Sequence, residues 1–153
     1  MANLHAAPSE IEAHRISAQL WDLWAVAPNE PAQELLDQGI SKRAVNDVLG
    51  ALADFNALVS YCPHYAEGYN QRAFAHFLQG DTLAALDDLS RAIELSPRHV
   101  GAIVGRAMLY LHLQEFDSAR NDLQRAVTLN PWLRERALME PGGVLASESR
   151  ETL

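Results

Sequence analysis

The sequence predicts an all-α protein built from stacked helix-turn-helix units, and two observations lead to this prediction. The first is that Pro63, Pro97 and Pro131 follow one another at a constant interval, a period of 34. The second is that an alanine, an aspartate and a bulky apolar residue recur in phase with these prolines. Self-similarity at a fixed period of this length is typical of repeat architectures. The recurring residues are Ala51, Ala85 and Ala119; Asp54, Asp88 and Asp122; Phe55, Leu89 and Leu123.

Each repeat is expected to consist of two antiparallel helices. In the second helix, the small alanine lets the first helix approach closely, and the bulky apolar residue four positions later lies one turn further on the same face. Proline has no backbone N–H and disfavours a helical conformation in the residue before it, so the second helix is expected to end near that residue. The turn between the helices contains Asn46 and Gly80, residue types that tolerate the left-handed conformation at a helix end.

These residues resemble the tetratricopeptide repeat family, whose 34-residue unit follows W-x2-L-G-x2-Y, then A-x3-F, then P. The second halves match best, reading AALDDLSRAIELSP at 84–97 and SARNDLQRAVTLNP at 118–131. The first halves depart from the pattern, because Arg72 and Arg106 replace the usual leucine. The sequence of residues 62–73 also resembles that of small stand-alone bacterial repeat proteins. The resemblance implies a right-handed solenoid of three repeats, at residues 32–65, 66–99 and 100–133.

The segments that flank the repeats are expected to cap the array, since each end of a stacked array otherwise exposes an apolar face. Ser9 and Glu12 have the spacing of a capping box, which predicts a helix at its start. That helix carries an apolar stripe and is expected to pack against the first repeat. The remaining predictions are a flexible N-terminus at 1–8, the capping helix at 9–28, a C-terminal capping segment at 134–143 that includes a short helix, and a disordered tail at 144–153.

Composition and charge exclude several classes of function. Hydrophobic residues make up 48% of the chain, enough for a sizeable core. The formal net charge of −8 repels nucleic-acid phosphates. No apolar run approaches the roughly 18 to 20 residues that cross a bilayer, and the start MANLHAAPSE lacks the pattern of an export signal. We therefore expect a soluble protein, cytoplasmic as the sequence is written and periplasmic if Met1 replaces a removed export signal.

No arrangement of residues predicts an enzyme, a cofactor or a metal site. The six histidines occupy unlike repeat positions. No pair has the four-residue spacing of a helical zinc site, so they are interpreted as helix-end or surface residues. Asp88 precedes Arg91 by three positions, as Asp122 precedes Arg125. Such pairs are interpreted as a solvated outer face, with a docking patch for a basic partner as the alternative.

The resemblance places function on the concave face, which the first helix of each repeat lines and on which family members bind peptides. The two-carboxylate clamp of the family is not expected, because Leu36, Ile40, Gly101 and Gly105 stand where cations and amides would be needed. Part of the apolar stripe is alternatively core between neighbouring helices. The expected lining is Leu36, Ile40, Arg43, Asn70, Phe74, Phe77, Leu78, Val104, Met108 and Leu111.

The sequence thus predicts a non-enzymatic interaction scaffold that binds a peptide or partner helix of unknown identity in an apolar concave groove. No cofactor, nucleic acid or membrane insertion is expected. The alternative is a self-assembling structural subunit, a homodimer formed through the groove or the terminal helices. Trp21 and Trp24 are interpreted either as capping core or as an exposed patch for that self-association.

Overall fold

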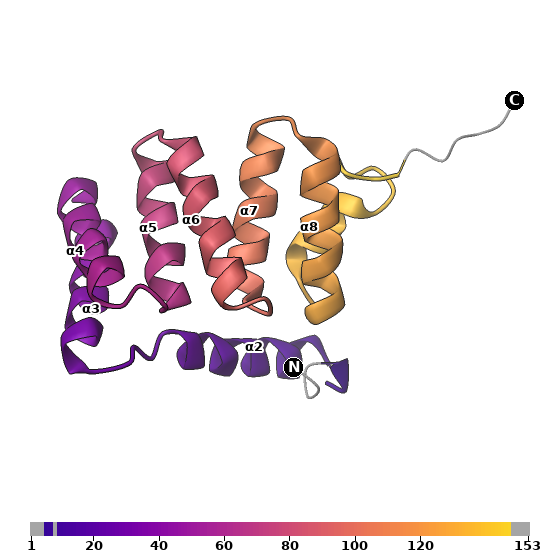
Figure 1. The fold of residues 1–153 in the computed structure, drawn as a ribbon. Helices are drawn as coiled ribbons and strands as arrows, with labels where there is room; N and C mark the ends of the chain where they lie inside the picture. Colours follow the sequence, from indigo (N-terminus) through magenta and orange to yellow (C-terminus); the bar gives the residue numbers. More distant parts are fainter. Residues whose placement is uncertain (1–4, 8, 148–153) are drawn as a thin grey trace, which may run out of the picture.

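The computed structural model describes residues 5–7 and 9–147, and every regular element in that part of the chain is helical. Three antiparallel helix pairs stack side by side, and one further helix lies across their ends (Figure 1). The predicted all-α class and the helix-turn-helix units are confirmed. The pairs are α3 (Glu30–Ala44) with α4 (Val48–Tyr61), α5 (Ala66–Leu78) with α6 (Thr82–Leu95), and α7 (Val100–His112) with α8 (Phe116–Leu129); α2 (Glu10–Trp24) precedes them and the 3-10 helix η1 (Arg134–Met139) follows.

The turns inside the three pairs share one backbone geometry. Asn46, Gly80 and Gln114 occupy the same position in successive repeats, and all have positive φ angles, of 64°, 84° and 61°. Two of these turns continue into an aspartate that caps the second helix. Asp47 accepts a hydrogen bond from the Gly50 N–H, and the corresponding aspartate of the next repeat caps α6 in the same way. Left-handed turn and side-chain cap together close each of these two helix hairpins.

The recurring alanines and apolar residues form the core, as their spacing predicts. Ala51, Ala85 and Ala119 are all fully buried. In the first pair, Phe55 fills the space between the helices, and this requires Gly39. A Cβ atom at Gly39 would lie 2.4 Å from a ring carbon of Phe55. Only glycine fits at this position in a close-packed interior.

The interpretation of the repeated aspartates as a solvated outer face is wrong. Asp88 and Asp122 are only 6% and 7% exposed. Each accepts two hydrogen bonds from the arginine that replaces the usual leucine in its own repeat. Arg106 Nε and Nη2 lie 2.7 and 2.8 Å from the Asp122 carboxylate oxygens. Arg72 donates to both carboxylate oxygens of Asp88 in the same way. The same arginines also reach the preceding repeat, since Arg106 donates to Ser90 Oγ at 3.2 Å. An arginine in place of leucine therefore ties neighbouring repeats together.

On the outer side of α3, polar side chains stand where the next repeat contacts its neighbour. Gly68 of α5 faces the preceding repeat closely, with Leu58 at 3.3 Å from its Cβ position, and Arg72 reaches the same neighbour. The residues one repeat earlier, Glu34 and Gln38, are exposed and hydrophilic. A polar outer face satisfies the end of an array without further cover.

Helix α2 does not pack against the first repeat, which corrects that prediction. The capping box is confirmed in its first half, since Ser9 Oγ accepts a hydrogen bond from the Glu12 N–H at 3.3 Å. The helix ends at Trp24, however, and crosses the ends of α5 to α8 (Figure 1). Asn130 Nδ2 donates to Ser17 Oγ at 3.2 Å, which ties α2 to the third repeat. The physical reason is that the Trp21 indole fits over Gly101 of α7 and the Trp24 indole stacks on His99. No helix in the described residues is long and apolar enough to cross a membrane.

The predicted disorder of the C-terminal tail is wrong at Leu145. This side chain is fully buried against Ala107, Ala119 and Leu123. Its backbone N–H donates to the Leu138 carbonyl at 2.7 Å, and its carbonyl accepts from Arg120 Nε at 3.0 Å. The segment thus covers the apolar end of the array, while the predicted closing helix is the 3-10 helix η1. Residues 148–153 and most of the predicted flexible N-terminus, 1–4 and 8, lie outside the described residues.

The buried Arg106–Asp122 pair gives a stability prediction. Arg106→Leu alone leaves the Asp122 carboxylate buried without its partner, and we expect a loss of about 3 kcal/mol in the free energy of unfolding. Arg106→Leu combined with Asp122→Leu restores an apolar contact and should recover most of that loss. Urea unfolding of the two variants beside wild type measures the difference. Equal destabilisation by the single and double variants would contradict the buried ion pair.

Candidate partner-binding groove

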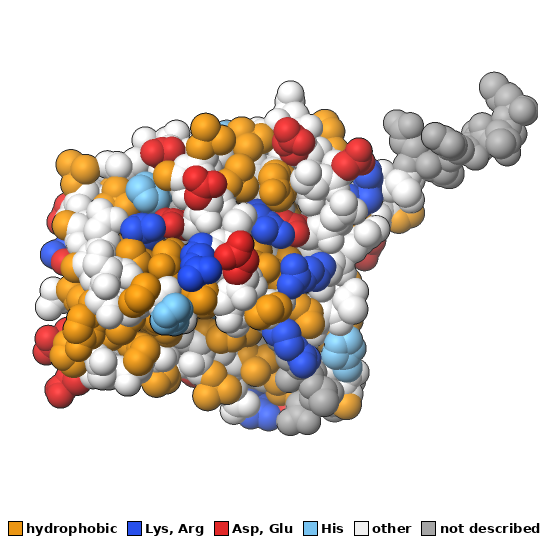
Figure 2. All heavy atoms as spheres, in the orientation of Figure 1, with side chains coloured by type: hydrophobic (Ala, Val, Ile, Leu, Met, Phe, Trp, Pro, Cys, Tyr) orange, Lys and Arg blue, Asp and Glu red, His pale blue; other side chains and the backbone are white. Residues whose placement is uncertain are grey.

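Residues from the first helices of all three repeats line one groove, which we refer to as the concave groove. It is a cavity of about 370 Å³ with an apolar wall and a polar end formed by Arg43, Asn70 and Gln71. Figure 2 shows one face of the molecule, on which hydrophobic side chains lie between basic and acidic ones. The lining residues are Trp21, Arg43, Asn70, Gln71, Ala73, Phe74, Phe77, Leu89, Gly101, Gly105, Met108 and Leu109.

Half of the residues that the sequence predicts for this face line the concave groove: Arg43, Asn70, Phe74, Phe77 and Met108. Phe74 and Phe77 are 51% and 37% exposed, so both are available to a ligand. Arg43 lies over the ring of Phe74, with its guanidinium carbon 4.5 Å from the ring centre, within the range of a cation–π contact. Aromatic surface and one cation therefore stand side by side.

The other predicted residues lie elsewhere. Leu36 is fully buried between α3 and α4, where no ligand reaches it, and Ile40 packs on the same cluster. Leu111 packs on the core of the third repeat. Leu78 is exposed but does not line the cavity. Val104 lines a second cavity, described next.

A second cavity, of about 460 Å³, lies between α2 and the third repeat. We refer to it as the strap cavity, because α2 spans it. Its walls include Leu20 and Trp24 from α2 and Val104 from α7. It shares Trp21, Gly101 and Gly105 with the concave groove, so the indole of Trp21 separates the two spaces.

Gly101 makes the position of Trp21 possible. A Cβ atom on Gly101 would lie 2.4 Å from a ring carbon of Trp21, too close for any other residue type at this position. Four positions on, Gly105 lies against Leu89 of α6 and lines both cavities. The absence of a side chain at Gly101 opens a slot on α7, and the Trp21 indole of the chain's own α2 occupies it.

Trp24 fixes the C-terminal end of α2 on a buried histidine. The indole stacks on the ring of His99, with centroids 4.4 Å apart and planes 11° apart. Its backbone carbonyl accepts a hydrogen bond from the Tyr65 hydroxyl at 2.8 Å. Trp21 meets both rings edge to face, at 5.7 Å. Offset and edge-to-face aromatic pairs of this kind stabilise by about 0.5 to 1.5 kcal/mol beyond their buried area.

His99 is fully buried, and its hydrogen bonds define its tautomer. It caps α7, with Nδ1 accepting from the Ala102 N–H at 3.1 Å. A ring nitrogen that accepts carries no proton, so the proton resides on the other nitrogen. That nitrogen, Nε2, donates to Glu67 Oε2 at 2.6 Å. The sequence predicts helix-end or surface positions for the histidines. His99 does lie at a helix end, as the N-cap of α7, but it is buried in the core.

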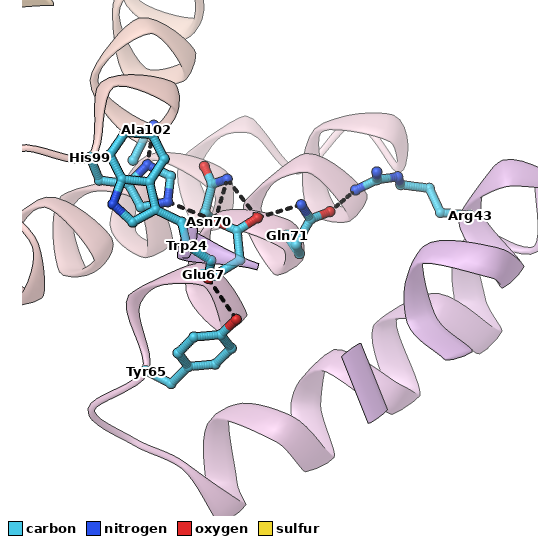
Figure 3. A network of polar contacts seen from close by, with 8 residues as sticks. All are labelled: Trp24, Arg43, Tyr65, Glu67, Asn70, Gln71, His99 and Ala102. Carbon is cyan, nitrogen blue, oxygen red and sulfur yellow. Dashed lines mark hydrogen bonds and ion pairs between the residues drawn. The ribbon is translucent and has the colours of Figure 1, made fainter. Parts of the chain in front are cut away.

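Glu67, 2% exposed, continues this network into the concave groove (Figure 3). Its carboxylate also accepts from Gln71 Nε2 at 2.5 Å and from Asn70 Nδ2 at 3.3 Å. Gln71 Oε1 in turn accepts from Arg43 Nη1. An unbroken polar chain thus runs from the stacking surface of Trp24 to the cation beside Phe74.

Burial acts on the ionisable groups at both ends of this chain. Burial lowers the pKa of Arg43, and the negative charge of Glu67 opposes that effect. Burial also raises the pKa of the Tyr65 hydroxyl, and the charge of Glu67 adds to it. Both directions follow from the cost of holding a charge away from water. Both groups keep their protons at neutral pH, so Tyr65 remains a donor to α2 and Arg43 remains a cation in the concave groove.

Sequence reasoning missed the role of α2 in this site. Its signal was present as two glycines four positions apart in α7, on the face where the family pattern needs large polar side chains. Helix-interior glycine costs stability relative to alanine, so a pair on one face indicates close approach of another group.

Among the described residues, no group of three or more histidine, cysteine, aspartate and glutamate side chains is arranged to hold a metal ion.

Comparison with known proteins finds similarity over the second and third repeats. The family model described as "Tetratricopeptide repeat" matches residues 66–99 and 100–131, and no curated protein sequence matches the chain. A solved structure described as the TPR2B-domain:pHsp70 complex of yeast Sti1 is 27% identical to this chain, with a TM-score of 0.63. The match covers 65% of this chain and 79% of the Sti1 chain.

Two further solved structures share the fold. The first TPR domain of Spaghetti (RPAP3), bound to the HSP90 peptide SRMEEVD, has a TM-score of 0.70 at 23% identity, covering 76% of this chain and 94% of its own. The Arabidopsis OM64 TPR domain has a TM-score of 0.68 at 18% identity, covering 72% of this chain and 92% of its own.

The buried carboxylate at the centre of the network gives a second stability prediction. Glu67→Ala leaves the buried Nε2 donor of His99 and the half-buried amide of Gln71 without their acceptor, and we expect a loss of about 3 kcal/mol in the free energy of unfolding. Glu67→Gln keeps an acceptor oxygen and should lose clearly less. Urea unfolding followed by circular dichroism makes the comparison, with Glu34→Ala as a control on an exposed glutamate. The network is refuted if Glu67→Ala and Glu34→Ala unfold alike.

Proposed function

Residues 66–131 of this chain belong to the tetratricopeptide repeat family, and from this premise we propose that the protein is an interaction module rather than an enzyme. The concave groove binds a peptide or helix of a partner protein. Similar domains support the proposal, since those of Sti1 and RPAP3 are found in complexes with pHsp70 and an HSP90 peptide. The single observation that carries it is the pair of exposed aromatic rings, Phe74 and Phe77, on the wall of the concave groove.

The energetics of these anchors suit a partner with apolar side chains. Burying one such ring stabilises a complex by roughly 1.5 to 3 kcal/mol. Phe74, Phe77 and Met108 together therefore offset the cost of ordering a short segment and sustain roughly micromolar affinity. Arg43, Asn70 and Gln71 line one end of the groove, where polar contacts orient the segment.

A clamp for two carboxylates is a poor match to this groove. Gly101 and Gly105 leave the groove-facing side of α7 without a cation, and the indole of Trp21 covers the first of them. The carboxylate of Glu67 lies just behind Asn70 and Gln71. An acidic chaperone tail would therefore meet one cation, a buried negative charge and an apolar wall.

The proposal is tested with peptides selected from a random library on the purified full chain. We expect the selected peptides to be rich in apolar side chains and to lose at least about tenfold in affinity for Phe77→Glu. Leu83→Glu is the matched control, since Leu83 is 71% exposed and does not line the concave groove. The peptide SRMEEVD should bind no better than a scrambled sequence.

Two results would contradict the proposal. One is a set of selected peptides that binds Phe77→Glu and Leu83→Glu equally, since the concave groove would then not be the site. The other is specific binding of SRMEEVD that survives Phe77→Glu, which would assign the groove to acidic tails. Sedimentation equilibrium on the same samples tests the homodimer, with Phe74→Glu and Trp24→Ala as the variants.

A further inference from the structure

Helix α2 is attached to the repeats by a small number of contacts. Of its fifteen residues, only Ala13 is buried. Ile11 and Leu23 are 83% and 69% exposed, so its apolar stripe is used only in part. A helix with so little buried surface is stabilised mainly by its anchors, and such elements open at low free-energy cost relative to global unfolding.

One anchor of α2, the Trp21 indole, sits where a ligand of the concave groove would sit. Trp21 lines the groove beside Phe74 and Met108 and fills the slot over Gly101. Because Trp21 also lines the strap cavity, its removal would join the two spaces into one continuous surface. The chain itself thus shows what this slot accepts, namely an indole carried on a helix.

We propose that α2 is a displaceable resident ligand of the concave groove, and that the partner is an amphipathic helix which presents aromatic side chains at the spacing of Trp21 and Trp24. This inference rests on the proposed function, because it assumes that the groove binds protein segments. A partner helix takes the slot over Gly101 and the stacking surface of His99 while α2 moves away. Partner affinity is therefore reduced by the fraction of molecules in which α2 is docked.

The experiment uses a fluorescent peptide with the sequence of residues 10–24 and the full-length chain, followed by fluorescence anisotropy. The peptide should bind wild type weakly, because the resident α2 competes with it. It should bind Trp21→Ala at least about tenfold more tightly, since that variant loses its internal competitor but keeps the slot. Leu23→Ala, which removes an exposed apolar side chain of the same helix, should match wild type.

Two further variants change residues of the repeats instead of residues of α2. Gly101→Leu fills the slot and should abolish peptide binding even in combination with Trp21→Ala. Gln33→Ala removes the side chain that donates to the Ala25 carbonyl and accepts from the Ala27 N–H. The peptide of residues 10–24 lacks both groups, so this change loosens the resident α2 alone and leaves the slot unaltered. It should raise peptide affinity about fivefold, which keeps the test valid if Trp21→Ala folds poorly. A peptide in which alanine replaces Trp21 should not bind.

The inference is overturned if the peptide binds wild type and Trp21→Ala with the same affinity, or binds none of the variants. Its failure is distinct from failure of the proposed function. Library peptides that depend on Phe77 but bind wild type and Trp21→Ala equally would leave the groove as the partner site and remove α2 as its competitor. Loss of the Phe77 dependence would remove the concave groove as the partner site and, with it, the premise of this inference.

Discussion

The buried contact between His99 and Glu67 is the interaction on which the site depends. It joins the start of α7 to α5, so it fixes the second and third repeats relative to each other. A buried carboxylate is stable only with several donors, and His99, Gln71 and Asn70 provide them. Because the same histidine ring is the surface on which Trp24 stacks, the contact that joins two repeats also holds α2.

The arrangement links the two ends of the binding surface physically. From His99 the hydrogen bonds continue through Glu67 and Gln71 to Arg43, whose guanidinium covers Phe74. Each member has a partner on both sides, so a shift of the stacked indole changes the environment of every donor along the chain. A continuous set of hydrogen bonds therefore joins the stacking surface of α2 to the polar end of the concave groove.

The fold was predictable because its determinants are local and repeated. Proline and alanine spacing indicated the helix pairs, and Asn46 and Gly80 indicated the turns, since these residue types act on the backbone next to them. The aspartates were misread because a spacing of three to Arg91 or Arg125 is visible in sequence, whereas the pairing of Asp122 with Arg106 depends on packing between helices. Leu145 was misread for the same reason, as its burial depends on a surface formed by α7 and α8.

The site was predictable only in part. Helical register assigned Phe74, Phe77 and Met108 to the concave face, and all three line the groove. It could not place α2, whose docking depends on the absence of a side chain at Gly101. An NMR measurement of nuclear Overhauser contacts across a dilution series tests directly whether α2 is bound within its own chain. We expect contacts between the Trp21 indole and the Gly101 Hα protons, and between Trp24 and His99, that persist unchanged at the lowest concentration. Their absence, or their loss on dilution, would contradict a resident helix bound within its own chain.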